Sequence, residues 1–136
     1  MNELLIVNAQ ILPVVGEEIA QGFLQIENGK IVSLGPMAQA PADGERYDAA
    51  GALALPGFID AHCHLGVCGD GLGIESDECN EMSDPVTPQL RAIDGVNPMD
   101  RCFAEAAAAG VTCVLTGPGS ANAIGGQFIA MKTAGR

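Results

Sequence analysis

Residues 55–66 read LPGFIDAHCHLG, and this stretch decides the fold class. Pro56-Gly57 is a turn signal. The residues after it, 58–63, form a nearly continuous apolar run that Asp60 interrupts. A short run of this kind favours a strand buried on both faces, as in a parallel sheet.

Two histidines stand at the end of this predicted strand. Side chains on a strand alternate between its faces, so Asp60, His62 and His64 share one face. Two imidazoles placed two residues apart can converge on one metal ion, and neutral imidazole suits zinc and similar divalent ions. Asp60 is expected to accept a ring N–H from a ligating histidine rather than to bind the metal itself.

A His-x-His pattern also arises by chance, as two ordinary histidines at a strand end. Two facts favour the metal site. His62 and His64 are the only histidines among the 136 residues. They also follow the carboxyl end of the apolar run, which is where the active sites of (β/α) barrels lie. Cys63 falls on the opposite face and is therefore not expected to act as a nucleophile.

The chain beyond residue 66 predicts one more strand–helix–strand unit. The predicted segments are a long loop at 67–98 with a short helix near 89–93, a helix ending at Gly110, a strand at 111–116, a glycine-rich loop at 117–126 and a strand at 127–132. Such units build a parallel sheet or a (β/α) barrel. For the longer helix, Asn97 is the candidate N-cap and Pro98 the first helical residue, with Met99 and Phe103 on one apolar face.

The residues before 55 predict a small antiparallel β unit. Its expected strands are 3–7, 11–15, 22–28 and 30–34, followed by a loop at 36–47. Asn28-Gly29 is the strongest hairpin signal in the chain. A two-stranded hairpin is marginal alone, so these strands need further strands to cover them.

LPGFIDAHCHLG resembles the first barrel strand of the amidohydrolase superfamily, and residues 1–55 resemble its amino-terminal β-sandwich segment. The stretches ESDECNEMSDPVTPQLRAIDGVNP, GVTCVLTGPGSANAIGGQ and FIAMKTAG resemble the imidazolonepropionase-related branch. The resemblance implies an α/β fold in two parts. A β-sandwich segment at 1–54 precedes, at 55–136, the first strands and helix of an incomplete (β/α)8 TIM-like barrel.

The same resemblance implies hydrolysis of a non-peptide C–N bond, in an amide or cyclic amide, by metal-activated hydroxide. His62 and His64 match the first two ligands of a centre that holds one or two divalent ions, zinc foremost. The family's further histidines and its late aspartate have no match here, so no catalytic residue is assigned and the chain alone is expected to be inactive. The alternative is a non-catalytic scaffold or binding relative, although the intact histidine pair favours the hydrolase. A small-molecule substrate is implied, and a homodimer is compatible with the family.

Several other residues have both a functional and an ordinary reading. Lys132 is either a bridging lysine of the centre or a surface lysine. The acids of the long loop either line the site for a cationic substrate or form a solvated loop; they are Glu75, Asp77, Glu78 and Glu81. The glycines of the second loop either cradle a phosphate or shape the mouth of the site; they are Gly117, Gly119, Gly125 and Gly126.

Composition limits the partners and the compartment. The net charge of −11 argues against binding of nucleic acid or an anionic membrane surface. The chain has no signal-peptide pattern and no apolar run long enough to span a membrane. Its five cysteines, an odd number, are expected to be reduced thiols of a soluble cytoplasmic protein; a zinc cluster within 63–79 is the alternative.

Overall fold

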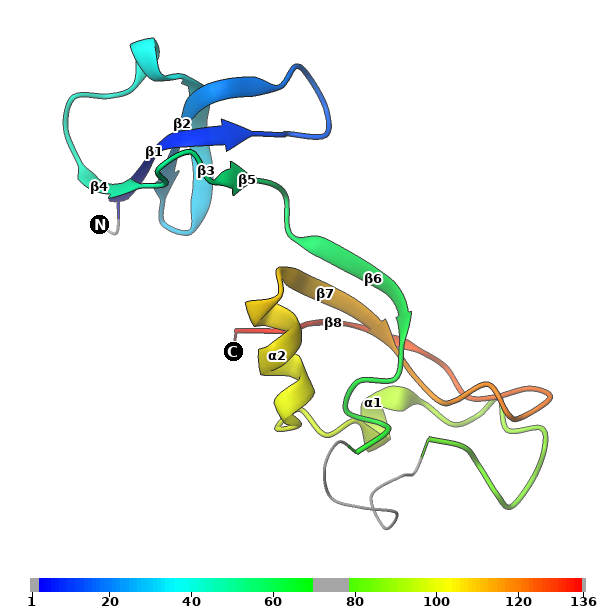
Figure 1. Cartoon of the computed structure of the whole chain (residues 1–136). Coiled ribbons are helices and arrows are strands. Elements are labelled where there is room, and N and C mark those ends of the chain that lie inside the picture. The colour runs from blue at the N-terminus through cyan, green and yellow to red at the C-terminus, as the bar shows by residue number, and fades with distance from the viewer. Residues whose placement is uncertain (1–2, 70–78, 136) are drawn as a thin grey trace. The chain divides into compact units, whose positions relative to one another are not determined.

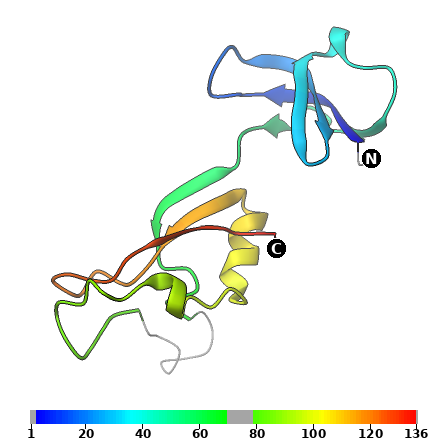
Figure 2. The same ribbon diagram turned by 180° about the vertical axis from the view of Figure 1, so that it is seen from behind.

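The computed structural model describes residues 3–69 and 79–135. The chain divides into two compact units, Met1–Pro56 and Gly57–Arg136, which are described separately below (Figures 1 and 2). No helix in the described part of the chain is long and apolar enough to cross a membrane.

The first unit is a five-stranded sheet with the order β3-β2-β1-β4, in which β5 also pairs with β1. Its strands are β1 Glu3–Ile11, β2 Ile19–Glu27, β3 Lys30–Pro36, β4 Glu45–Asp48 and β5 Leu53–Ala54. β1 is antiparallel to β2 and parallel to β4 and β5. Alternate residues of β1 face two small cores, one around Leu5, Val7 and Phe23 and one around Ala9, Ile11 and Leu24.

The predicted hairpin forms between β2 and β3. Asn28 and Gly29 have φ values of 51° and 75°, which is the positive-φ pair that a type I′ turn requires. The strand expected at 3–7 continues to Ile11 and contains a bulge at Asn8, because Asn8 has φ 56° and the register with β2 shifts there.

Two other sequence predictions for the first unit were wrong. The strand expected at 11–15 does not form: Ile11 ends β1, Pro13 has no N–H to pair, and Val14 and Val15 are exposed. The loop expected at 36–47 contains a 3-10 turn, η1 at Met37–Gln39, and the start of β4, which gains parallel hydrogen bonds to β1.

The second unit contains the predicted strand–helix–strand unit. Its elements are β6 Phe58–Cys63, α1 Ala92–Gly95, α2 Arg101–Ala108, β7 Val111–Thr116 and β8 Ile129–Lys132. β6 and β7 are parallel, as expected, and β8 joins β7 on its other side in the antiparallel direction. Helix α2 lies against β7 (Figures 1 and 2).

Helix α2 begins three residues later than predicted. Its N-cap is Asp100, whose carboxylate accepts a hydrogen bond from the Cys102 amide at 3.0 Å. Asn97 does not cap the helix, because its backbone amide donates to Gly66 O at 2.8 Å and its side chain accepts from the Met99 amide. The helix ends at Ala108 with Ala109 as its C-cap, and Gly110 follows with φ 88°, which stops the helix as predicted. Phe103 is buried as expected, whereas Met99 lies before the helix and is exposed.

Strand β6 is not buried on both faces. Phe58 and Ile59 are 56% and 72% exposed. The reason is that β6 is the edge strand of its sheet, paired only with β7 among the described residues. Apolar side chains of β6 therefore remain exposed in the described part of the chain.

Candidate metal centre

The two histidines lie together at the carboxyl end of β6. His62 is in the strand and His64 is the first residue after it, two positions beyond His62, so alternation directs both rings to one face. Their ring centroids are 5.2 Å apart and the ring planes are nearly perpendicular, at 86°. Two imidazoles that share a tetrahedral zinc, with Zn–N distances of about 2.0–2.1 Å, have ring centres about 5 Å apart. The observed separation therefore fits a shared divalent ion.

A backbone carbonyl fixes which nitrogen of His64 can bind a metal. Nδ1 of His64 lies 2.7 Å from Gly117 O. A carbonyl oxygen can only accept, so Nδ1 carries the hydrogen and Nε2 retains its lone pair. This is the usual arrangement of a metal-binding histidine, in which the second ring nitrogen donates to a protein acceptor.

The end of β7 holds the end of β6 at two further points. The Gly117 amide donates to Cys63 O at 3.2 Å, and the Thr116 hydroxyl donates to Leu65 O at 2.7 Å. Thr116 is completely buried. The backbone on both sides of His64 is thus bonded to Thr116, the last residue of β7, and to Gly117, which follows it.

Phe128 closes the cluster of rings. Its ring centroid lies 5.1 Å from that of His62 and 6.2 Å from that of His64. No local pattern predicts the Phe128 contact, because Phe128 reaches the histidines only after the loop 117–128 returns to the sheet. Gly117 instead follows β7 directly and lies beside the end of β6. Only the glycine content of that loop hinted at a close approach.

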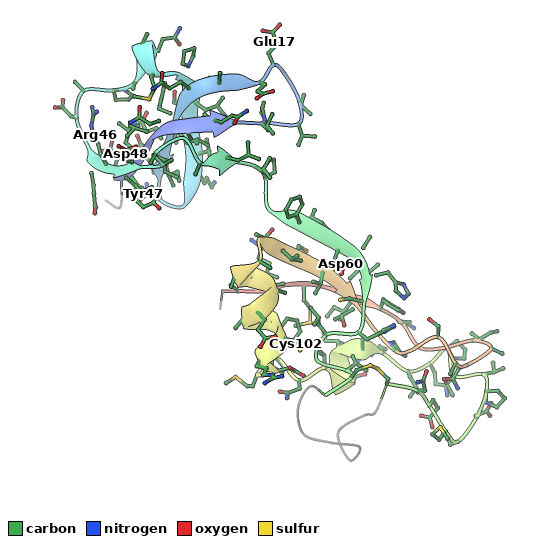
Figure 3. The ribbon with its side chains drawn as sticks, in the orientation of Figure 1. Glu17, Arg46, Tyr47, Asp48, Asp60 and Cys102 are labelled. Carbon is green, nitrogen blue, oxygen red and sulfur yellow. A yellow bond between two sulfur atoms is a disulfide. The ribbon has the colours of Figure 1, made fainter. Side chains whose placement is uncertain are left out.

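Asp60 is the third residue of β6 and is labelled in Figure 3. Its carboxylate accepts from the backbone amide of His62 at 3.1 Å. The acceptor that the structure gives to a histidine ring is Gly117 O; the sequence analysis had considered Gly117 only as a loop glycine at the mouth of the site. A role for Asp60 as an acceptor of a ring N–H stays a prediction.

The long loop and the glycine-rich loop are bonded to each other. The Thr87 amide donates to Ile124 O, the Ala92 amide to Gln127 O and the Gln127 amide to Leu90 O, each at 2.8 Å. Two further amides of the glycine-rich loop, those of Gly119 and Ile124, donate to Cys79 O and Pro85 O. These amides are already engaged within the protein, which argues against the phosphate-cradling alternative for this loop.

The glycines of this loop permit close packing. A Cβ atom on Gly126 would lie 2.8 Å from Leu90 O, and one on Gly117 would lie 2.5 Å from the Phe128 ring. By contrast, Gly125 has no neighbour closer than 3.9 Å. Gly117 and Gly126 are therefore explained by the contacts between segments.

A cavity of about 600 Å³ lies between the two loops. Its wall includes Pro118, which follows the residue that binds His64, together with Glu81, Thr87, Arg91 and Asn122. The Thr87 hydroxyl and Asn122 Oδ1 are buried and have no hydrogen-bond partner among the described residues.

The remaining candidate residues are placed as follows. The carboxylate of Glu81 accepts from the Ser83 amide at 2.8 Å, and hydrogen bonds from Ser83 hold the pKa of this carboxyl below its usual range. Lys132 closes β8 with an exposed side chain, and a bridging role for it stays a prediction. Three acids of the long loop, Glu75, Asp77 and Glu78, lie outside the described residues.

The expectation that all cysteines are reduced was wrong for one pair. The structure joins Cys68 and Cys79 in a disulfide, with Cα atoms 4.8 Å apart. The two residues meet because the Cys68 amide donates to His64 O while Cys79 O accepts from Gly119, which brings both to the same edge. This pairing removes the two thiolates that a zinc cluster within 63–79 would use. Among residues 3–69 and 79–135, no group of three or more His, Cys, Asp or Glu side chains could hold a metal ion.

Comparison with known proteins identifies the family, although no family model matches the chain. Amidohydrolase tasK of Hapsidospora irregularis is 39% identical over 117 residues, which are 83% of this chain and 12% of that protein. An imidazolonepropionase of Saccharopolyspora erythraea is 45% identical over 53 residues, which are 39% of this chain and 14% of that protein.

A solved structure, an amidohydrolase from Thermotoga maritima, matches with a TM-score of 0.85 and 39% identity. The match covers 97% of this chain and 34% of that one, so the chain spans about a third of its structural neighbour. The predicted fold class, a β-rich segment followed by the beginning of an α/β unit, is confirmed by this match. The chain belongs to the amidohydrolase superfamily, in its imidazolonepropionase-related branch.

Proposed function

We propose that His62 and His64 are two ligands of a divalent metal, zinc foremost, in an enzyme that hydrolyses a non-peptide C–N bond. The observation that carries the proposal is the geometry of the pair. The rings are 5.2 Å apart, and the Gly117 carbonyl leaves Nε2 of His64 available as a ligand.

The residues of this chain would hold and orient the ion. Imidazole nitrogens suit zinc, and a rigid backbone acceptor on Nδ1 keeps the ring of His64 in one orientation. When bound, a divalent ion supplies Lewis acidity and lowers the pKa of a water molecule toward neutrality. Catalytic zinc sites have three protein ligands as a rule, so further ligands are needed for turnover.

The substrate class follows from the relatives. Similar proteins include amidohydrolases, imidazolonepropionases and adenine deaminases, so we propose an amide or cyclic amide of a small molecule as the substrate. A homodimer stays a prediction from the family resemblance. We also propose a cytoplasmic location. In that reducing compartment, Cys68 and Cys79 would be thiols and not the disulfide of the structure.

The test is calorimetric titration of the chain with zinc chloride. The unmodified chain is expected to bind one zinc ion weakly, and His62→Ala and His64→Ala should each abolish the heat of binding. Cys63→Ala is the matched control, because Cys63 lies between the histidines on the opposite face of β6. Equal binding by the chain and both histidine variants would overturn the proposal and favour a non-catalytic scaffold.

A further inference from the structure

We propose that the loop 117–128 is the positioning element of the histidine pair. In this proposal Gly117 selects the protonated nitrogen of His64, and Phe128 fixes the orientation of both rings. The inference rests on the proposed function, since it assigns how that site is organised, and neither residue is a catalytic residue.

Both ends of the loop contact the pair. At one end, Gly117 O lies 2.7 Å from Nδ1 of His64. At the other end, the Phe128 ring lies against His62 and His64, with centroid distances of 5.1 and 6.2 Å. Gly117 and Phe128 also contact each other closely, because a Cβ atom at position 117 would come within 2.5 Å of the aromatic ring.

The middle of the loop is fastened to a separate segment. Backbone hydrogen bonds from Gly119, Ile124 and Gln127 reach residues 79–90. The side chain of Asn122 adds a bond of 2.8 Å to Glu81 O. The loop ends are therefore set by hydrogen bonds within the protein itself, as a preorganised site requires.

The consequence concerns the tautomer of His64. In a neutral imidazole one ring nitrogen carries a hydrogen and the other has a free lone pair. A protein group that accepts the hydrogen from one nitrogen leaves the other nitrogen to bind a metal. The hydrogen bond to Gly117 O requires the Nδ1–H tautomer. Removal of the Phe128 side chain frees the rings of His62 and His64 to rotate. This should weaken the hydrogen bond from His64 Nδ1 to Gly117 O and allow the two rings to leave their common face.

The experiment is a long-range ¹H–¹⁵N correlation spectrum of the metal-free chain at pH 8, followed by zinc titration. The unmodified chain should show His64 as the Nδ1–H tautomer. Phe128→Ala should mix the two tautomers and weaken zinc binding by roughly 10-fold, the scale on which supporting groups act. Phe128→Leu, which restores bulk but no ring, should fall between them.

Phe23→Leu is the control for general loss of packing, because Phe23 is a buried core residue of the first unit. It should change neither the tautomer nor zinc binding. An Nε2–H tautomer of His64 in the unmodified chain would overturn the inference without any variant. Zinc binding by Phe128→Ala within two-fold of the unmodified chain would overturn it as well. A third outcome separates the two proposals. If His64 has the predicted tautomer and this depends on Phe128, but neither the unmodified chain nor any variant binds zinc, the positioning role is supported and the proposed function is overturned.

Discussion

Thr87 and Thr116 are both buried threonines of the second unit, and they differ in what their hydroxyl groups contact. Thr116 is fully buried and donates to Leu65 O at 2.7 Å, next to His64. Thr87 is 3% exposed, and its hydroxyl has no partner among the described residues. Removal of a buried partner leaves the other group unsatisfied, whereas removal of an unpartnered hydroxyl does not.

Replacement of each threonine by valine tests this difference. Thr116→Val should lower the free energy of unfolding by about 1–3 kcal/mol, because Leu65 O loses its donor. Thr87→Val should leave it unchanged or raise it. Urea unfolding followed by circular dichroism measures both. A loss for Thr87→Val as large as that for Thr116→Val would show that the Thr87 hydroxyl is bonded.

Asp94 provides a pH-dependent test at the same scale. Arg91 donates to both carboxylate oxygens of Asp94, at 2.9 and 2.8 Å. These hydrogen bonds, and the charge of Arg91, hold the pKa of Asp94 below its usual range. Because the folded pKa is lowered, the pair contributes stability above the unfolded pKa of about 3.9, and this is lost as the pH falls through the lowered folded pKa.

Arg91→Gln should therefore return the pKa of Asp94 to its ordinary range and remove this pair's contribution to the fall of stability at acid pH. Carboxyl ¹³C NMR titration reads the pKa directly. Arg46→Gln is the control, since the Arg46 guanidinium binds the carbonyl groups of Pro41 and Ala42 in the first unit. An unchanged Asp94 titration in Arg91→Gln would contradict the assignment.

At the scale of elements, the sequence predicted the segments with strong local signals. Strands β6 and β7, the body of α2 and the Asn28-Gly29 hairpin all follow from apolar runs, alanine content and turn residues. The start of α2 was misplaced because Asn97 and Asp100 are both good N-caps. The choice depends on the distant bond between Asn97 and Gly66 O, which no local pattern reveals.

The pairing of the two loops was also beyond sequence reasoning. Residues 85–92 and 124–127 have no hydrophobic periodicity, and they are joined by backbone hydrogen bonds between segments far apart in the chain. The same holds for the site. The His-x-His spacing identified His62 and His64. The Gly117 contact depends on the pairing of β7 with β6, and the Phe128 contact depends on where the loop after β7 returns.

Two neighbouring glycines test the loop pairing. Gly126→Ala places a Cβ atom 2.8 Å from Leu90 O and should destabilise the second unit by about 1–3 kcal/mol. Gly125→Ala, one residue earlier, meets nothing closer than 3.9 Å and should be neutral or slightly stabilising. Thermal unfolding of the two variants gives the comparison, and equal melting temperatures would argue against the close approach of the loops.

The disulfide makes a second prediction at this scale. In the purified, unreduced chain, iodoacetamide should modify Cys63 and Cys113, whereas Cys68 and Cys79 should react only after reduction and unfolding. Peptide mass spectrometry identifies the modified residues. Modification of Cys79 in the unreduced, unfolded chain would show that the pair is not bonded.

At the scale of the whole molecule, the proposed metal centre has two histidine ligands, which stand at the end of an edge strand. Phe58 and Ile59 of the edge strand β6 remain exposed, and two histidines are the only ligands assigned. Two ligands hold a divalent ion weakly. We therefore expect the purified 136-residue chain to show no zinc-dependent hydrolysis of amides or cyclic amides. Turnover that depends on zinc and is lost in His62→Ala would contradict this expectation.

The most direct test of the metal centre is zinc X-ray absorption of the zinc-loaded chain. Nitrogen and oxygen ligands lie about 2.0–2.1 Å from zinc and thiolate sulfur about 2.3 Å from it, so the two are readily distinguished. We predict a nitrogen and oxygen shell with two imidazole ligands, and we expect this imidazole signal to be lost in His62→Ala and in His64→Ala together with the bound zinc. A sulfur shell, or an imidazole signal unchanged in both variants, would place the metal elsewhere and refute the central assignment.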